Sequence, residues 1–351
     1  DGLILSEDKS MVFLTYDDTL KEISLPDETE RIYSFAFYPC RELVSIRLGK
    51  NAAKFDKCAF PNTGARSMRV HGKASGHLPT ALERIMVSEE NDTFTSVDGF
   101  LYSKDMGTLL AAPEVIPGGN VELPEKTVRI AAEAMKGNQG IKKLIARRDL
   151  EEVEASAFED CFSLETVVLA GVNVIGKGAF CECIALTSVA IEKADVIGYN
   201  AFSGCERLEA AKIGSVSIID TGAFYNCAEL QEMILPENLK TIKDLAFAQT
   251  KLKKVSVPKS VESLGEEAFY GCYGLTIELY DTLESMSGKL AYSWDPFNDR
   301  WECAQHRIVV KNSRDDTIRY VVYMGKSNGT SSKYRETVVK GGRNYLSFDF
   351  P

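Results

Sequence analysis

Short apolar segments with period-two alternation recur along this sequence, and each is typical of a strand that buries one face. Examples are Ile46-Arg47-Leu48, Val189-Ala190-Ile191 and Val255-Ser256-Val257. A second apolar pair, such as Val196-Ile197, and then an Ala-Phe pair recur between these segments. The pattern therefore predicts units of two short strands and one buried aromatic ring, joined by polar turns.

The Ala-Phe pairs repeat in register along the chain. From Phe158 onward, consecutive Phe residues are separated by 22, 22, 22, 23 and 22 positions. In most units a Cys stands three residues after the Phe and a Leu six residues after it. The pairs are Ala36-Phe37, Ala59-Phe60, Ala157-Phe158, Ala179-Phe180, Ala201-Phe202, Ala223-Phe224, Ala246-Phe247 and Ala268-Phe269. A fixed period of this length predicts a solenoid whose units bury a shared core by stacking.

A larger unit of about 98 residues occurs twice. Residues 98–105 echo residues 1–8, and Leu123-Pro124 echoes Leu25-Pro26. Each copy opens on an apolar–turn–apolar segment, which predicts β-hairpin inserts at residues 1–16 and about 97–113. Because the first copy starts inside its hairpin, and the last residues are apolar, we expect the native chain to continue at both ends.

The pattern I-G-x-x-A-F-x-x-C-x-x-L-x-x-V-x-L, which covers residues 30–60 and 130–279, resembles the BspA-like (Treponema pallidum-type) leucine-rich repeat. The resemblance implies an α/β leucine-rich-repeat solenoid, a right-handed superhelix with a parallel sheet on its concave side. Short helical turns or irregular segments would form the convex side. Residues 1–279 would form this array, and residues 280–351 a C-terminal cap with a small antiparallel β module.

Six of the nine cysteines occupy one column of the repeat. A disulfide ladder or a metal stripe is one reading of this column. However, parallel strands lie about 4.8 Å apart, which keeps equivalent Cβ atoms beyond the usual disulfide range of about 3.5–4.5 Å. We therefore favour buried, unpaired thiols that pack as small hydrophobes. Cys58, Cys181 and Cys303 lie off the column, and the sequence leaves open whether they are reactive or paired.

The charge and the remaining motifs exclude several classes of function. The chain has 351 residues and a net charge of −10, which argues against binding nucleic acid or an anionic membrane surface. No apolar stretch approaches the roughly 20 residues that span a bilayer, so we expect no direct membrane insertion.

His71, His77 and His306 show no metal-ligand spacing, and no nucleotide-binding or nucleophile motif is present. We expect no cofactor, no metal and no enzymatic activity. Asn91-Asp92-Thr93 and Asn328-Gly329-Thr330 match the glycosylation triplet.

The candidate binding surface is the outward column of the concave sheet. In leucine-rich repeats, the residue between the two buried strand positions faces outward. This column contains Arg47, Arg69, Met86, Ile145, Val168, Ala190, Lys212, Ile234, Ser256 and Glu278. A solvated strand face is ordinarily polar, yet the middle of this column is apolar. The sequence therefore predicts a partner site centred on Met86, Ile145, Val168 and Ile234, unless a hairpin insert or the C-terminal segment covers it.

Two functions follow from these features. The first is a non-enzymatic protein-binding or adhesion module that recognises a protein partner of unknown identity and acts as a monomer. The second is a structural spacer or scaffold segment that presents another domain of a larger protein. The resemblance implies a bacterial or protist protein at the cell surface or secreted, whereas the unpaired cysteines leave the cytoplasm open.

Overall fold

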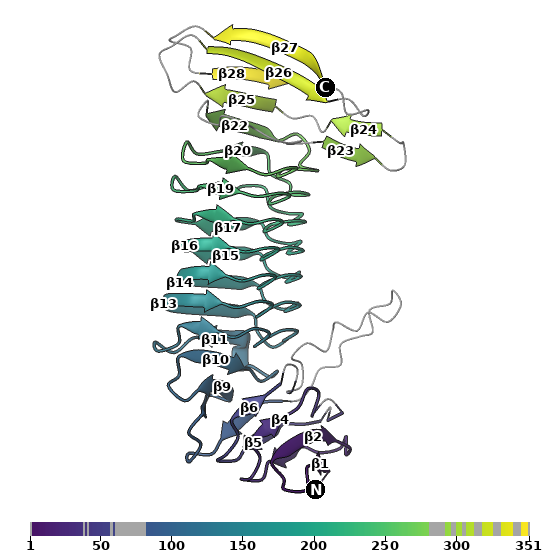
Figure 1. The fold of residues 1–351 in the computed structure, drawn as a ribbon, viewed down its shortest axis with the longest axis vertical. Helices are drawn as coiled ribbons and strands as arrows, with labels where there is room; N and C mark the ends of the chain where they lie inside the picture. The colour runs from purple at the N-terminus through teal and green to yellow at the C-terminus, as the bar shows by residue number, and fades with distance from the viewer. Residues whose placement is uncertain are drawn as a thin grey trace.

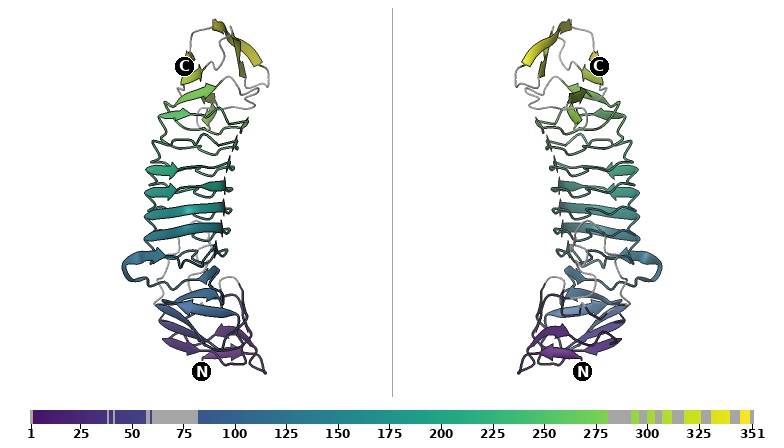
Figure 2. Two further views of the ribbon diagram at one scale, coloured as in Figure 1. Left: turned by 90° about the vertical axis from the view of Figure 1, so that its left-hand side faces the viewer. Right: turned by 90° about the vertical axis from the view of Figure 1, so that its right-hand side faces the viewer.

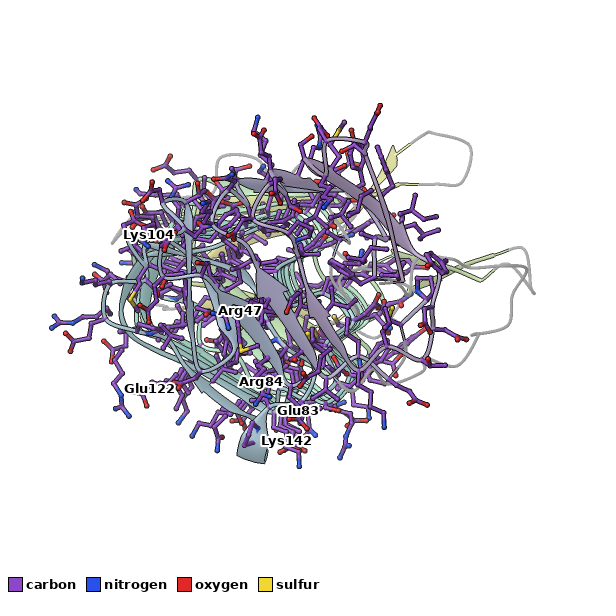
Figure 3. All side chains as sticks on the ribbon, turned by 90° about the horizontal axis from the view of Figure 1, so that it is seen from below. Arg47, Glu83, Arg84, Lys104, Glu122 and Lys142 are labelled. Atoms are coloured by element: carbon purple, nitrogen blue, oxygen red, sulfur yellow. The ribbon has the colours of Figure 1, made fainter. Side chains whose placement is uncertain are left out.

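The chain forms an elongated stack of coils with the N-terminus at one end and the C-terminal strands at the other (Figure 1). This computed structural model describes residues 2–37, 39–40, 42–56, 59 and 82–280. It also describes C-terminal strands at residues 292–295, 300–303, 307–311, 318–325, 331–339 and 345–349. Figure 3 looks along the stack from its N-terminal end and shows charged side chains such as Lys104 and Glu122 at its periphery. The apolar columns of the repeat lie inside.

One wall of the stack, here termed the front wall, consists of parallel strands. Its strands are β3 (Glu22–Ser24), β5 (Ser45–Leu48), β7 (Arg84–Val87), β11 (Asn120–Glu122), the first part of β13 (Lys143–Val153) and of β14 (Thr166–Ile175), β15 (Ser188–Ile191), β17 (Ala210–Ile213), β20 (Lys254–Ser256) and β22 (Thr276–Tyr280). Val167 is in register with Val189, and Val189 with Ala211, one coil further on. Equivalent residues therefore face the same way in every coil, which keeps one side of the wall buried.

A second set of short parallel strands forms the back wall. It contains β2 (Met11–Thr15), β4 (Arg31–Ile32), β6 (Lys54–Phe55), β10 (Thr108–Ala111), β12 (Arg129–Ile130), the last part of β13 and β14, β16 (Ala194–Ile197), β18 (Ile218–Ile219), β19 (Thr241–Ile242) and β21 (Ser263–Leu264). Strand β13 pairs with both β11 and β12, so it runs from the front wall into the back wall. The side views in Figure 2 show these strands stacked along the length of the molecule.

The connections between the walls are turns rather than helices. Within the described residues the one helical element is the 3-10 helix Pro117–Gly119. Each coil instead has a residue with positive φ two positions before its Phe, as at Ser156 (56°), Gly178 (60°) and Asn200 (52°). A left-handed residue interrupts any right-handed helical run at this point. The described part is thus a β-solenoid of stacked parallel strands, and of the two alternatives expected for the convex side it has irregular turns rather than short helices.

The predicted aromatic column is the centre of the core. The rings from Phe158 to Phe269 form a continuous stack in which neighbouring centroids are between 5.0 and 5.6 Å apart. The backbone N–H of Phe158 donates to the carbonyl of Ala179 at 2.7 Å, and that of Phe180 to Ala201 at 2.8 Å. Alanine at this position lets adjacent coils approach closely. The same repeat therefore supplies both the buried ring and the backbone bonds beside it.

The predicted cysteine column consists of buried free thiols, as expected. Its members are Cys40, Cys161, Cys183, Cys205, Cys227 and Cys272. The thiol of Cys183 donates to the carbonyl of Phe158 at 3.1 Å, and that of Cys205 to Phe180 at 3.2 Å. Each of these two thiols thus donates a hydrogen bond to a backbone carbonyl of the preceding coil, next to the aromatic stack. Cys181 is free and half-buried, Cys58 lies outside the described residues, and Cys303 is described only as part of a strand backbone.

Hairpin strands occur once in each 98-residue unit. In the first unit β1 (Leu3–Leu5) pairs antiparallel with β2, and in the second β8 (Phe94–Val97) and β9 (Phe100–Ser103) precede β10. The buried apolar residues fall into two clusters that meet at the second hairpin. One runs from Val12 to Ala111 and the other from Phe100 to Ile277.

The C-terminal strands pair only in part with their neighbours along the chain. Strand β25 (Arg307–Lys311) is parallel to β22 and antiparallel to β28 (Tyr345–Asp349). Strand β26 (Ile318–Gly325) pairs with β27 (Ser331–Val339), and β23 (Tyr292–Asp295) pairs with β24 (Arg300–Cys303). The sheet of the front wall therefore continues through β25 to β28. The side chains of residues 281–351, which include the expected C-terminal cap, lie outside what the structure describes.

Candidate functional site: a groove on the front wall

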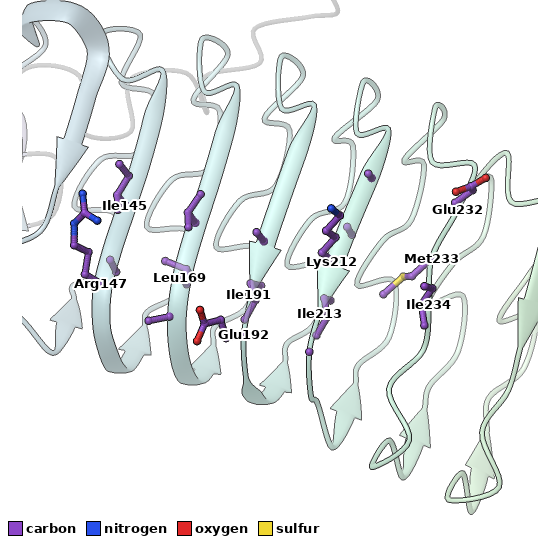
Figure 4. A pocket seen from close by; sticks show the side chains of 17 residues that line it. Ile145, Arg147, Leu169, Ile191, Glu192, Lys212, Ile213, Glu232, Met233 and Ile234 are labelled. Carbon is purple, nitrogen blue, oxygen red and sulfur yellow. The ribbon is translucent and has the colours of Figure 1, made fainter.

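An open groove crosses the outward face of the front wall (Figure 4). Its volume is about 790 Å³, within the range of ligand-binding clefts. It is lined by Ile145, Ala146, Arg147, Val168, Leu169, Ala170, Ala190, Ile191, Glu192, Ala210, Ala211, Lys212, Ile213, Gly214, Glu232, Met233 and Ile234. The groove crosses successive coils and opens to solvent, so its shape suits an extended chain or a protruding loop.

The groove is hollow because its central coils carry small side chains. Ala170, Ala190 and Ala210 face outward in the middle, where neighbouring strands lie about 4.8 Å apart. The larger side chains of Ile145 and Ile234 stand at the two ends. Ala190 is in register with Val168 and Ala210 with Ser188, so the alanines occupy different columns of the repeat and their short side chains cross the strands diagonally.

The floor of the groove is an aliphatic row held in register. Ile145 is paired with Val168, Val168 with Ala190, and Ala190 with Lys212. Ile234 is 85% exposed, more than any other large hydrophobic residue in the described part of the chain. Ile145, Val168 and Ala190 are half-buried, so together with Ile234 they leave apolar surface in water, which is typical of a contact surface.

Charged side chains flank the aliphatic row. The guanidinium of Arg147 donates two hydrogen bonds to the carboxylate of Glu122, the longer of them 3.2 Å from Nη2 to Oε2. These bonds lower the pKa of Glu122 and raise that of Arg147. Beside this pair, Lys193 Nζ lies 2.6 Å from Asp149 Oδ2. One end of the groove is therefore bordered by matched charges rather than by a single sign of charge.

Three further charged residues at the groove have no ion pair among the described residues: Glu192, Lys212 and Glu232. Lys212 lies in register with Ala190 and so continues the aliphatic row with its methylene stem. Long lysine stems cover apolar surface while their ammonium groups stay in water. A partner carboxylate above this row would have Lys212 available to it.

The structure brings half of the predicted column together at the groove. Ile145, Val168, Ala190, Lys212 and Ile234 line it, and Ser256 and Glu278 continue the same column on β20 and β22. Glu278 is half-buried, and its carboxylate lies 2.8 Å from Lys254 Nζ.

The other predicted residues lie elsewhere. Arg47 and Met86 are in register with each other on β5 and β7, in a separate sheet on the N-terminal side of the hairpin. Met86 is therefore not part of the groove centre, because the hairpin strands intervene between β7 and β11. Arg69 lies outside the described residues.

Sequence reasoning missed Glu122, which occupies the column beside Ile145 and positions Arg147. Its column position could have been found from the repeat of Leu25-Pro26 at Leu123-Pro124.

The described residues contain no metal-binding cluster of histidine, cysteine or acidic side chains. The three histidines lie outside the described residues. Burial raises the pKa of Cys183 well above its ordinary value and that of Cys181 to about 12. These thiols remain protonated near neutral pH and are poor nucleophiles.

One of the two glycosylation triplets starts at a buried asparagine. Asn91 has 0% exposure, and its side-chain nitrogen donates to the carbonyls of Gly49 at 2.9 Å and Ala52 at 2.8 Å. A glycan on this nitrogen would break both contacts, so Asn91 serves the fold rather than modification. Asn328 lies outside the described residues.

Several solved structures are similar to this chain. A leucine-rich repeat protein from Eubacterium ventriosum ATCC 27560 is 18% identical, with a TM-score of 0.50; the match covers 75% of this chain and 91% of that one. A leucine rich cell surface protein from Faecalibacterium prausnitzii A2-165 is 20% identical, with a TM-score of 0.46, and the match covers 71% and 62% of the two chains. A leucine rich repeat protein from T. pallidum is 18% identical, with a TM-score of 0.24, and the match covers 82% and 95%.

No curated protein matches the chain. The described residues contain no helix with the length and apolar character that crossing a membrane requires. The family model of the BspA type leucine rich repeat region matches in six copies, over residues 10–76, 118–215 and 167–276. These ranges span more than half of the sequence, and their described residues lie in the stacked coils. The chain belongs to the BspA type leucine-rich repeat family.

Proposed function

We propose that this chain is a non-enzymatic protein-binding module, of the adhesion type, that recognises a protein partner at the groove on its front wall. The observation that carries the proposal is the aliphatic row from Ile145 to Ala190, together with the 85% exposure of Ile234. Full burial of one such isoleucine contributes about 1.5–3 kcal/mol. A partner that covers this row would therefore gain binding free energy, because apolar surface that is in water in the free protein becomes buried.

The architecture supports recognition by shape. The floor residues are held in register by strands whose inward faces pack on the core, so a partner meets a surface that is already ordered. Binding to a preorganised surface loses less conformational entropy than binding to a mobile loop. The unpaired charges of Glu192, Lys212 and Glu232 would set the register of the partner. A place at the cell surface is part of this proposal and rests on the printed name of the Faecalibacterium prausnitzii protein.

Two matched double variants test this function. Ile145→Asp with Val168→Asp places two carboxylates on the groove floor. Val174→Asp with Val196→Asp places two on the back wall, at positions of comparable partial burial that are in register one coil apart. A partner isolated with the wild-type chain is purified, and its affinity for all three proteins is measured. We expect at least a tenfold loss for the groove variant alone. Equal affinity for the three folded proteins would place the site elsewhere.

A structural spacer that presents another domain is the second candidate. The continuous stack from Phe158 to Phe269 supports it, because each coil is fixed to its neighbours. In a spacer the groove is dispensable. Retention of the full protein's function by a folded groove variant would therefore favour the spacer over the binding module.

A further inference from the structure

Strand β13 has one residue more than β14 at the corner where it turns from the front wall into the back wall. Ala146 pairs with Leu169 and Asp149 with Gly171, so the segment between the paired residues is longer by one residue in β13 than in β14. An extra residue in one strand of a pair is a β-bulge, which redirects the side chains next to it.

The bulge places two arginines side by side at one end of the groove. Arg147 and Arg148 are both exposed, although consecutive residues of a regular strand face opposite sides. Together with Lys126 of the preceding coil they line a second pocket of about 570 Å³, whose other lining residues are Glu125 and Asp149. Arg147 also lines the groove, so this pocket, here termed the corner pocket, adjoins it.

The corner pocket has an excess of positive charge. The carboxylate of Asp149 is paired at 2.6 Å with Lys193, which comes from outside the pocket. The carboxylate of Glu125 lies 3.9 Å from the guanidinium of Arg148, beyond hydrogen-bond distance. Arg148 and Lys126 therefore keep hydrogen-bond donors that a further anion can use.

The opposite end of the groove has an excess of negative charge. Glu232 is exposed and in register with Lys254, but the ammonium of Lys254 lies 2.8 Å from the carboxylate of Glu278. Two carboxylates therefore share one cation at this end. Figure 4 shows Arg147 and Glu232 at opposite corners of the groove. The charges between them, one carboxylate and one ammonium, cancel.

One column of the front wall repeats this polarity. It begins with a cation and ends with a carboxylate, and the residues between them are uncharged. Its members are Lys143, Thr166, Ser188, Ala210 and Glu232. Neither Lys143 nor Glu232 has an ion pair in the described part of the chain. The positive end of this column thus lies on the same strand as the arginines of the corner pocket.

The two ends are separated by the length of a short extended peptide. Ile145 and Ile234 stand in one column, four coils apart. At a strand spacing of about 4.8 Å, four coils correspond to about 19 Å. An extended chain rises about 3.3 Å per residue, so about six residues span this distance. Opposite charges about six residues apart in a ligand would therefore meet both ends of the groove.

We propose that the groove binds an extended peptide segment with acidic side chains at the corner pocket and a basic side chain at Glu232, about six residues away. Small apolar side chains between them lie over the alanines of the groove. This assignment rests on the proposed function and names the chemistry of the partner. The two charged ends determine which way the segment lies, because the opposite placement brings like charges together.

The probe is a short fluorescent peptide with two glutamates at one end, a lysine at the other and alternating alanine and valine over the positions between. The same sequence in reverse is the second probe, because the proposal specifies the order of charges and not the direction of the backbone. The control peptide has the same composition with its charged residues together in the middle. We expect one of the probes to bind at least about threefold more tightly than the control at low salt, with the difference lost at 1 M salt, where the Debye length is about 3 Å.

Crosslinking tests which way the bound peptide lies. A photoreactive group beside the glutamates should react with residues 122–149, and one beside the lysine with residues 230–256. Mass spectrometry identifies the crosslinked residues. Reaction of either group with both ends of the groove to the same extent would overturn the proposal.

The matched chain variants are Arg148→Glu and Lys54→Glu. Each replaces an exposed positive charge by a negative one, but Lys54 lies on β6 of the back wall. We expect Arg148→Glu to weaken probe binding at least about threefold and Lys54→Glu to leave it unchanged. Equal binding by the two folded variants would overturn the proposal, and so would failure of both probes to bind the wild-type chain. In either case the proposed function keeps its own test, which uses the isolated partner and the groove variant.

Discussion

The rings of Phe180 and Phe202 lie with their centroids 5.1 Å apart and their planes 2° from parallel. Phe202 makes a second contact of the same kind with Phe224, at 5.3 Å. All three rings are fully buried. Each interior ring therefore belongs to two coil–coil interfaces at once, and its loss leaves a void in the middle of the stack rather than at its surface.

Replacement of such a ring should be among the most damaging single changes. Phe202→Ala is expected to lower the free energy of unfolding by about 3–5 kcal/mol, because the stacked coils cannot collapse into the void. Denaturant unfolding followed by circular dichroism measures this loss. Phe202→Leu serves as the control and should cost less. A loss below about 1 kcal/mol for Phe202→Ala would show that the column is not core.

The adjacent residues Met233 and Ile234 should differ sharply in how much the same substitution destabilises the fold. Ile234 is 85% exposed and Met233 only 6%. Ile234→Asp is expected to change the free energy of unfolding by less than about 0.5 kcal/mol. Met233→Asp buries a carboxylate and should cost several kcal/mol or prevent folding. Thermal unfolding of the two variants tests this, and equal effects would mean that Ile234 is covered in solution.

The buried thiols should make stability fall at alkaline pH. Burial raises the pKa of Cys161, Cys183 and Cys227 well above the ordinary value of 9.0. The unfolded chain therefore loses these protons near pH 9 while the folded chain keeps them. Stability from this source is complete below pH 9 and falls above it, by about 1.4 kcal/mol per pH unit for each thiol.

A cysteine variant separates this effect from other alkaline titrations. In Cys183→Ala the decline of unfolding free energy between pH 9 and 10.5 should be less steep than in the wild-type chain, by the share of one thiol. Urea unfolding at a series of pH values provides the slopes. Identical slopes for the two proteins would contradict the burial of Cys183.

Asn91 should be essential to the junction between the two units. Its side-chain oxygen accepts hydrogen bonds from the backbone N–H groups of Thr93 and Phe94, and its nitrogen binds two carbonyls. Asn91→Ala leaves these buried groups without their partner and should cost at least about 2 kcal/mol. Asp92→Ala, at the exposed neighbouring position, should have little effect. Calorimetric unfolding of both variants makes the comparison.

The interior of this fold could be predicted from sequence because it is periodic. The spacing of Phe158, Phe180 and Phe202 by 22 residues fixes which side chains share a column, and column identity decides burial. The unpaired state of Cys183 follows from the same geometry. Period alone thus identifies both the core and the outward column.

The remaining features depend on contacts that no period encodes. The stretch from Lys143 to Val153 is one strand around a corner, since it pairs with strands of both walls. The hollow of the groove arises because the side chains of Ala190 and Ala210 are shorter than that of the nearby Ile145. The repeat determines that these positions face outward, but it does not determine the size of their side chains. Met86 has an equivalent column position, which predicts a place in the same site, but the hairpin separates its strand from the groove.

The division of the apolar core bears on how binding can be detected. The buried residues below the groove, such as Leu169 and Ile191, belong to the longer cluster, and the shorter cluster ends at the hairpin. The second hairpin carries members of both clusters, so the two clusters join within one element. A partner seated in the groove would therefore stabilise the longer cluster directly and the shorter cluster only through that hairpin. Hydrogen exchange measured on the two sides of the hairpin would show how far stabilisation by a bound partner spreads along the stack.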